Sequence, residues 1–226
     1  MRYALIPAFN EEETIEEVIL RLKKHIDVEV IVVDDGSSDA TPEIVKKLGH
    51  TLVRHETNKG KGEAINTGFK YIVKNYPKAK YVVIIDADLQ YRPEDAYKLL
   101  EPLEKGEADI VTGFRDPKNI PYANRFGNFI WRFTFNLLFG THFKDTNCGY
   151  MAFTTDAVKK IKKVHGGYII ENSILAQSVK SGLRVKQVDV KVLYGKRKIT
   201  KFARMAFGVI IFIVIEGLKF RLGLKD

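Results

Sequence analysis

The hydrophobic pattern of the first half of the chain alternates between short apolar runs and amphipathic segments. The runs at 3–7, 29–33, 51–55, 81–85 and 110–113 are typical of strands. Helices are predicted at 12–24, from 41 onward, and at 61–74 and 93–104; the first places Ile15, Val18, Ile19 and Leu22 on one face. This alternation predicts an α/β fold: a mainly parallel sheet, covered by helices on both faces and joined by right-handed crossovers.

The run Tyr81–Ile85 leads directly into Asp86-Ala87-Asp88. The run shows no polar alternation, so we interpret it as a strand that is buried on both faces. Residues two apart in an extended chain point the same way, and two carboxylates so placed repel each other unless a cation lies between them. Mg²⁺ or Mn²⁺ holding a diphosphate would relieve this repulsion. The plainer alternative is a solvated strand end with two surface aspartates.

Two further strand ends carry polar groups, at 7–11 and 34–37. The carboxyl ends of parallel strands meet at one edge of a sheet, where such folds bind ligands. Asp-Asp-Gly at 34–36 is also ordinary turn chemistry, but three such ends together favour a binding site. Residues 58–62, Asn-Lys-Gly-Lys-Gly, precede a helix and lack the Gly-Lys-Ser/Thr ending of a P-loop. They are equally well interpreted as a basic turn or as a helix start near an anionic ligand.

The charge is divided unevenly along the chain. The net charge is +9 over 226 residues, but residues 1–113 contribute −5 and residues 114–226 contribute +14. The basic half therefore suits an anionic partner, such as nucleic acid, a phospholipid surface or a phosphorylated substrate. The single cysteine, Cys148, excludes an internal disulfide and fits a reducing compartment. We see no signal-peptide pattern before the first strand.

Two segments of the basic half are unusually apolar. Residues 122–139 are rich in aromatic side chains over a wide helical arc, which indicates either core packing or contact with lipid. Basic residues at 196–204 precede the apolar run 206–215, which is too short to cross a bilayer of ~30 Å as a helix. We expect a helix at 201–226 that lies at a membrane interface. The alternative is a helix packed on its own domain or on a second subunit.

Several of these motifs together resemble one known family. The segments 7–12, 32–39, 58–62 and 86–90 look like glycosyltransferase family 2, most of all its dolichol-phosphate mannosyltransferase and polyprenyl-phosphate glycosyltransferase branch. The resemblance continues through 113–115 and 145–150 and covers roughly residues 3 to 200. It departs from the family at Phe9, where tyrosine is common, and at Met151, where arginine is expected.

The resemblance implies a GT-A fold, a nucleotide-diphosphate sugar donor, a divalent cation (Mg²⁺ or Mn²⁺) and inversion at the anomeric carbon. It places around the nucleotide Pro7, Phe9, Glu11, Val33, Asp35 and Asp86. Asp86, Asp88 and Gln90 would stand near the metal and the diphosphate. The residues expected to support catalysis are Asp88, Arg115, Arg125 and Arg197. The three arginines would receive the acceptor phosphate. An ionised phosphate needs no strong general base, and we interpret the five histidines as surface or structural groups.

These expectations define one hypothesis and several rivals. We expect a GT-A domain at 1–200 and an interfacial helix at 201–226, in a peripheral enzyme on the cytoplasmic face of a membrane. It would move a hexose to a dolichyl or polyprenyl phosphate and would not bind nucleic acid. The resemblance favours GDP-mannose as donor and leaves UDP-glucose and UDP-N-acetylglucosamine open. A protein or polysaccharide acceptor and a non-enzymatic nucleotide sensor are the rivals. A receiver domain would be shorter and would leave the basic half unexplained.

Overall fold

The computed structural model describes residues 1–116, 122–193 and 202–224, with the backbone alone at 122–124 and 202–207. The five predicted strands are confirmed, and so are the predicted helices between them. In chain order these elements are β1 Arg2–Ala8, α1 Ile15–His25, β2 Glu29–Asp34, α2 Thr41–Lys47, β3 Thr51–Arg54, α3 Lys61–Asn75, β4 Tyr81–Ile84, α4 Ala96–Glu104 and β5 Ile110–Phe114.

The first helix begins three residues later than predicted. The backbone N–H of Glu11 donates to Thr41 Oγ1 at 2.8 Å, and that of Glu12 donates to an oxygen of Asp39 at 3.1 Å. These bonds hold the segment as a loop against the start of α2, so helical geometry begins only at Ile15. The loop after β1 is thereby fixed beside the loop after β2.

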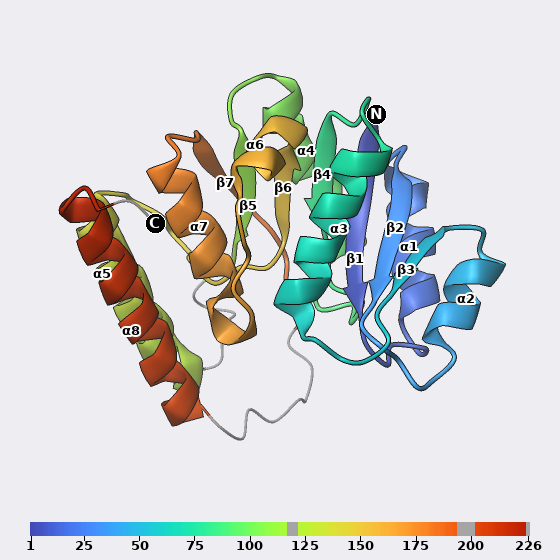
Figure 1. Cartoon of the computed structure of the whole chain (residues 1–226), viewed down its shortest axis with the longest axis horizontal. Coiled ribbons are helices and arrows are strands. Elements are labelled where there is room, and N and C mark those ends of the chain that lie inside the picture. Colours follow the sequence, from blue (N-terminus) through green and yellow to red (C-terminus); the bar gives the residue numbers. More distant parts are fainter. Residues whose placement is uncertain (117–121, 194–201, 225–226) are drawn as a thin grey trace.

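The strands form one seven-stranded sheet in the order β3-β2-β1-β4-β6-β5-β7 (Figure 1). Two of these strands, β6 (Met151–Thr154) and β7 (Val185–Asp189), were not predicted. β7 pairs parallel with β5, whereas β6 runs antiparallel to both β4 and β5. The start of β6 therefore lies at the same edge as the carboxyl ends of its neighbours. The loop that precedes β6 thus joins the loops that follow β4 and β5.

Helices cover both faces of the sheet, as predicted, and β1 shows how the faces are divided. Tyr3 and Leu5 pack into the core under α3, whereas Ala4 and Ile6 pack into the core under α1 and α4. The first core also receives helices of the second half of the chain: α5 Tyr122–Phe139, α6 Thr155–Lys160, α7 Ile170–Lys180 and α8 Phe202–Arg221.

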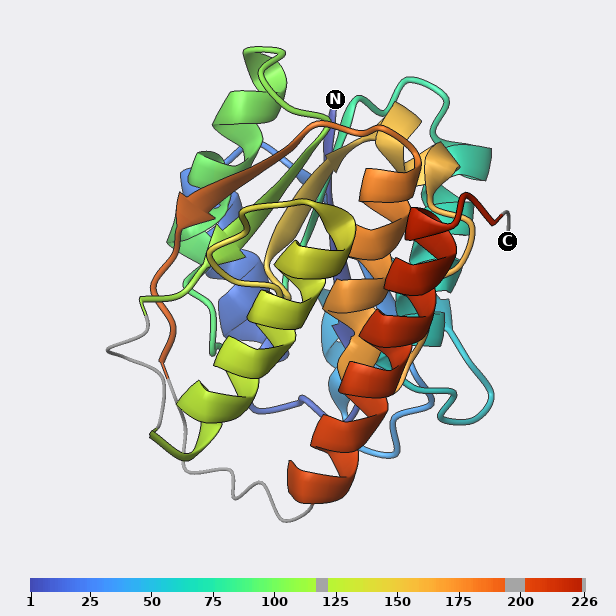
Figure 2. The same ribbon diagram turned by 90° about the vertical axis from the view of Figure 1, so that its left-hand side faces the viewer.

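Helices α5 and α8 pack together at one end of the molecule (Figures 1 and 2). The rings of Phe139 and Phe220 stack at 5.4 Å, and Arg221 donates to the backbone carbonyls of Leu137 and Leu138. Their inner sides are buried in the core. Their outer sides expose an apolar face made of Phe126, Phe129, Phe133, Leu137, Ile211, Ile215, Leu218 and Leu222. Residues 122–139 thus contribute to the core and also expose apolar surface.

Glu216 interrupts the apolar sequence of α8 for a structural reason. Its carboxylate accepts from Lys180 of α7 at 2.6 Å and from Lys219 at 3.0 Å. Burial works to raise the pKa of Glu216, but these two ammonium groups outweigh it and lower the pKa. The pair with Lys180 ties α8 to α7. Within the described residues, no helix combines the length and hydropathy that crossing a membrane requires.

Candidate active site

The loops after β1, β2 and β4 meet at the carboxyl edge of the sheet around a cavity of about 280 Å³. We call it the donor cavity, because the sequence motifs predict a sugar donor at these residues. It is lined by Pro7, Ala8, Phe9, Glu11, Asp35, Asn58, Gly60, Lys61, Ala64, Asp86, Ala87 and Asp88. Five of the six residues predicted around a nucleotide therefore lie together. The sixth, Val33, pairs with Pro7 within the sheet and is buried in the core, so its side chain does not line the cavity.

Asp35 shapes the donor cavity by fixing the loop between β3 and α3. Its carboxylate accepts from the backbone N–H groups of Lys59 and Gly60 at 2.9 and 2.7 Å, and it contacts His55 Nδ1 at 2.6 Å. The adjacent Gly36 has φ +79°, and a Cβ there would lie 2.8 Å from the carbonyl carbon of Thr57. His55 is buried and serves a structural role, in line with the interpretation of the histidines from sequence.

A half-buried lysine, with 33% of its side chain accessible, lies beside the first aspartate of the Asp-Ala-Asp motif. Lys61 Nζ is 2.6 Å from Oδ1 and 2.8 Å from Oδ2 of Asp86, but it donates a hydrogen bond only to Oδ2. Burial works to lower the pKa of Lys61, and the charges of Asp86 and Glu171 outweigh this and raise it. Lys61 belongs to the segment 58–62 and is the first residue of α3, and its side chain lines the donor cavity. The segment is therefore a helix start, which was one of its two interpretations.

Glu171, at the start of α7, joins this charged group although it lies far along the chain. A Cβ at Gly149 would meet Glu171 Oε1 at 3.1 Å, Lys61 Nζ at 3.3 Å and Asp86 Oδ2 at 3.7 Å. Glycine at 149 thus allows the backbone to approach all three side chains. Burial raises the pKa of the Glu171 carboxyl. Glu171 stands in the first turn of α7, so its carboxylate also complements the dipole of that helix.

Asp88 lies next to Asp86 in the donor cavity, as predicted. Burial raises the pKa of Asp88, and the negative charge of Asp86 raises it further. The backbone N–H of Gln90 donates to Asp88 Oδ1 at 3.0 Å, and Leu89 between them adopts φ +58°. Gln90 does not line the donor cavity. Together with Asp88 it lines a neighbouring cavity of about 590 Å³ that also contains Glu11, Glu12, Glu13 and Asp39.

The carboxylates of Asp86 and Asp88 fit a divalent cation that takes most of its ligands from a substrate. Among the described residues, no group of three or more His, Cys, Asp or Glu side chains is arranged to hold a metal. Asp86 Oδ1 accepts no hydrogen bond, although the Lys61 ammonium lies 2.6 Å away as its ion-pair partner. Burial and the charge of Asp86 together raise the pKa of the Asp88 carboxyl. Mg²⁺ is commonly bound by one or two carboxylates together with substrate phosphates and water. Asp86 and Asp88 are suited to that mode.

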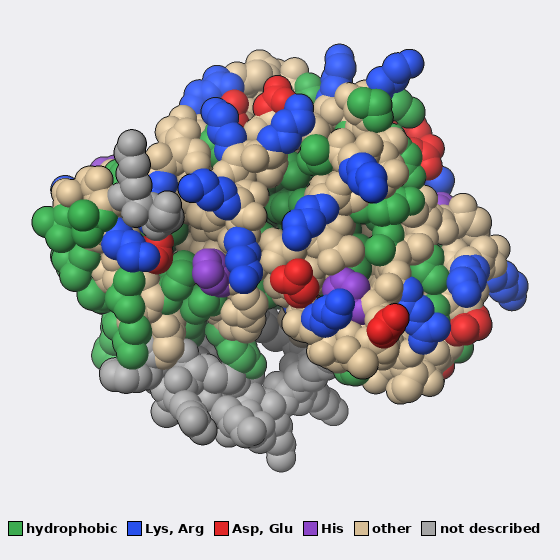
Figure 3. Space-filling model, viewed as in Figure 1, with side chains coloured by type: hydrophobic (Ala, Val, Ile, Leu, Met, Phe, Trp, Pro, Cys, Tyr) green, Lys and Arg blue, Asp and Glu red, His purple; other side chains and the backbone are tan. Residues whose placement is uncertain are grey.

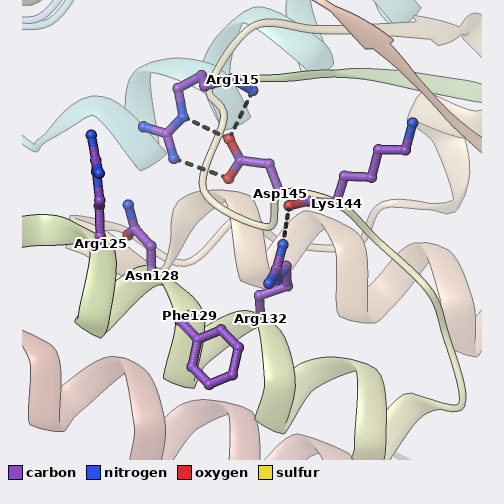
Figure 4. Close-up of a pocket in the computed structure, with 7 residues that line it drawn as sticks. All are labelled: Arg115, Arg125, Asn128, Phe129, Arg132, Lys144 and Asp145. Carbon is purple, nitrogen blue, oxygen red and sulfur yellow. Dashed lines mark hydrogen bonds and ion pairs between the residues drawn. The ribbon is translucent and has the colours of Figure 1, made fainter. Parts of the chain in front are cut away.

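A second cavity, of about 210 Å³, is basic and includes Asp145, at the start of the loop 145–150 (Figure 4). We call it the acceptor cavity, because it holds two of the arginines predicted to receive the acceptor phosphate. It is lined by Arg115, Arg125, Asn128, Phe129, Arg132, Lys144 and Asp145. Two of the three arginines predicted to receive a phosphate therefore lie together. Arg197 lies outside the described residues. The sequence reasoning missed Arg132 and Lys144; their only signal was the positive charge of the second half.

The loop 145–150 links the two cavities through side-chain amides and one phenol. Asn147 accepts from Asn172 of α7 at 2.7 Å and donates to Asn128 of α5 at 3.1 Å. The backbone N–H of Gly149 donates to the buried hydroxyl of Tyr91 at 2.9 Å. The loop therefore holds the helix that carries Glu171, the helix that lines the acceptor cavity and the segment after Asp88.

The α/β sheet thus carries an acidic cavity and a basic cavity, an arrangement that suits an enzyme with charged substrates. Residues 3–162 match the family described as Glycosyl transferase family 2. The chain belongs to this family, as the sequence motifs indicated.

Two relatives agree with the branch that the motifs resembled. A UDP-N-acetylglucosamine–dolichyl-phosphate N-acetylglucosaminyltransferase of Methanococcus voltae is 31% identical over 242 residues, covering 96% of this chain and 95% of that protein. A dolichol-phosphate mannosyltransferase of Pyrococcus furiosus is 35% identical over 118 residues, covering 49% of this chain and 32% of that protein.

A solved structure supports the fold assignment. Glucosyl-3-phosphoglycerate synthase of Mycobacterium tuberculosis, in complex with Mn²⁺, UDP and glucosyl-3-phosphoglycerate, superposes with a TM-score of 0.76 at 25% identity. The match covers all of this chain and 81% of that one. The fold is therefore GT-A, and the seven-stranded mixed sheet is its core.

Proposed function

We propose that this protein transfers a hexose, with inversion, from a nucleotide-diphosphate sugar to a polyprenyl or dolichyl phosphate. The observation that carries the proposal is the pairing of an acidic donor cavity with a basic acceptor cavity across the loop 145–150. The acceptor phosphate is already ionised at neutral pH, so it attacks the anomeric carbon without a strong general base. Such a reaction depends on positioning and on charge stabilisation, and the charged side chains of the two cavities support the proposal on this point.

In the donor cavity, Asp86 and Asp88 would hold Mg²⁺ or Mn²⁺ together with the diphosphate. The cation neutralises charge that develops on the leaving diphosphate. Lys61 is placed to contribute in the same way, because its ammonium group is held 2.8 Å from Asp86 Oδ2 at the cavity wall. Phe9 presents an exposed ring at the cavity, with 43% of its surface accessible, which suits stacking against a nucleotide base.

Two donors deserve the first test. The sequence motifs favour GDP-mannose, and the Pyrococcus furiosus relative is a mannosyltransferase. The relative from Methanococcus voltae, whose name gives UDP-N-acetylglucosamine as donor, aligns over nearly the whole chain. UDP-glucose remains a third candidate.

We also propose that the enzyme is a peripheral protein of the cytoplasmic membrane face, with residues 201–226 forming its interfacial helix. The support is the outer face of α5 and α8, where hydrophobic side chains gather (Figure 3). Arg125 and Arg132 lie beside this face and suit anionic headgroups. The acceptor cavity opens next to the same face, since Phe129 belongs to both.

A radiolabelled transfer assay tests the proposal. The purified chain would be incubated with Mn²⁺, a polyprenyl phosphate and one labelled donor, either GDP-mannose, UDP-N-acetylglucosamine or UDP-glucose, and label would be counted in the organic phase. Label from one donor, released by mild acid as the free sugar, would establish the reaction and name the donor. Absence of label from every donor would refute the lipid acceptor. Transfer to protein or polysaccharide in parallel reactions, or nucleotide binding without turnover, would then identify the rival.

A further inference from the structure

One edge of the Arg115 guanidinium group, formed by Nε and Nη2, is already engaged within the protein. Its Nε and Nη2 donate to the two carboxylate oxygens of Asp145 at 2.6 and 3.0 Å, and its backbone N–H donates to Asp145 as well. Both side chains are almost completely buried. Burial works to lower the pKa of Arg115. The charge of Asp145 and the hydrogen bond to it outweigh burial, and they raise the pKa of Arg115 well above its usual value. The charge that Arg115 could offer a phosphate is therefore largely offset.

Arg132 also lines the acceptor cavity, from α5, and its contacts among the described residues are of a different kind. It follows Arg125 by seven residues on α5, close to two helical turns, so both project to one side of the helix. Its Nη1 donates to the carbonyl oxygen of Lys144 at 3.1 Å, and its guanidinium lies 5.7 Å from the ring centre of Phe129. Among the described residues, no carboxylate forms an ion pair with Arg132. The contacts orient the guanidinium without neutralising it (Figure 4).

We propose that Arg132, together with Arg125, binds the acceptor phosphate, and that Arg115 instead positions the loop 145–150 through Asp145. This proposal rests on the proposed function and names a binding residue for its acceptor. A phosphate monoester carries a charge of about −1.5 to −2 at neutral pH and is well matched by arginine forks. The small acceptor cavity brings both arginines within reach of one such group.

The arrangement also gives the acceptor a direction. Phe129 lies beneath Arg132 and stacks on Phe133 at a centroid distance of 6.2 Å, and both rings belong to the exposed apolar face of α5. A phosphate held at Arg132 would therefore leave its prenyl chain against these rings. A polar acceptor of the same charge gains nothing from them.

Binding of geranyl phosphate, a short water-soluble probe, tests the proposal without requiring turnover. The single tryptophan, Trp131, adjoins Arg132 and provides a fluorescence signal, with calorimetry as a second readout. Hydrogen bonds to charged groups contribute about 1.5–3 kcal/mol. Arg132→Gln should therefore weaken binding by roughly 10-fold to 100-fold. The matched control, Lys70→Gln on the exposed side of α3, removes one positive charge outside the cavity and should bind as the wild type does.

A double variant tests the role given to Arg115. Arg115→Gln with Asp145→Asn keeps a neutral pair that can still hydrogen-bond, and its geranyl phosphate affinity should stay within about threefold of the wild type. Unchanged binding by a folded Arg132→Gln protein, or loss of binding by a folded double variant, would overturn the proposal. If Arg132→Gln does not fold, Arg132→Lys keeps the charge without the fork and should show an intermediate loss.

Transfer kinetics separate this inference from the proposed function. With a polyprenyl phosphate acceptor, Arg132→Gln should raise the KM for the lipid and leave the KM for the nucleotide sugar within about twofold. A wild-type protein that forms no labelled lipid but binds geranyl phosphate through Arg132 would refute the function and support the site. A wild-type protein that forms labelled lipid, with an unchanged lipid KM in Arg132→Gln, would refute the site alone.

Discussion

Replacement of Asp145 by alanine should destabilise the protein strongly, because it leaves the buried guanidinium of Arg115 without its partner. The carboxylate is 6% exposed and accepts from Nε and Nη2 of Arg115 and from the backbone N–H groups of Arg115 and Asn147. Breaking a buried ion pair by removing one member costs about 3–5 kcal/mol. That is a large part of the ~5–15 kcal/mol that stabilises a typical domain.

The loss can be measured by urea and thermal unfolding followed through Trp131. For a chain of this size, about 2–4 °C per kcal/mol converts the loss into a fall of roughly 6–20 °C in the melting temperature. The double variant Arg115→Gln/Asp145→Asn should recover most of the loss, because no unpaired charge is then buried. The reasoning is refuted if Asp145→Ala lies within about 1 kcal/mol of the wild type, or if the double variant is as unstable as the single one.

Three further outcomes are expected. Asp88→Ala should lower turnover by at least ~100-fold without unfolding the chain, and chelation should stop wild-type transfer; near-normal activity would exclude the metal assignment. Phe133→Asp, at a ring that is 58% exposed, should reduce co-sedimentation with anionic vesicles and leave the melting temperature unchanged. Arg21 lowers the pKa of Glu94 to about 2 through a side-chain hydrogen bond. The pair therefore stabilises the fold fully above pH ~4.5, and this stabilisation is lost as the pH falls toward 2. Arg21→Gln should show less acid sensitivity over that range, by about 1 kcal/mol, and an identical pH profile would contradict this.

The donor side of the site could be predicted from the sequence because it depends on local signals. Each of its loops follows an apolar run, and parallel strands bring their carboxyl ends to one edge by geometry alone. Pro7, Phe9, Glu11, Asp35, Asp86 and Asp88 all line the donor cavity for this reason. Val33 lies within β2 and is buried in the core, so it does not line the cavity, and its predicted place beside the nucleotide stays a prediction.

The acceptor side depends on contacts between distant segments, which no local pattern records. Arg132 stands in an aromatic-rich segment, and only the packing of α5 against the loop 145–150 brings it into the cavity. The ion pair of Arg115 and Asp145 joins residues thirty positions apart. β6 was missed because Met151–Thr154 has only four residues and directly follows a loop. A run that short is too brief to show the alternation of apolar and polar residues that indicates a strand.

The central position of β6 has a consequence for the order in which the chain can assemble. β4 ends at Ile84, but the strand that covers its free edge begins only at Met151. During synthesis from the N-terminus, β1 to β4 can pair before β6 exists, which leaves an apolar strand edge open to other chains. Insertion of β6 closes that edge and in the same step draws the loop 145–150 between the two cavities. We therefore expect a chain that ends before β6 to be aggregation-prone, and it lacks the loop 145–150 that contributes Asp145 to the basic cavity.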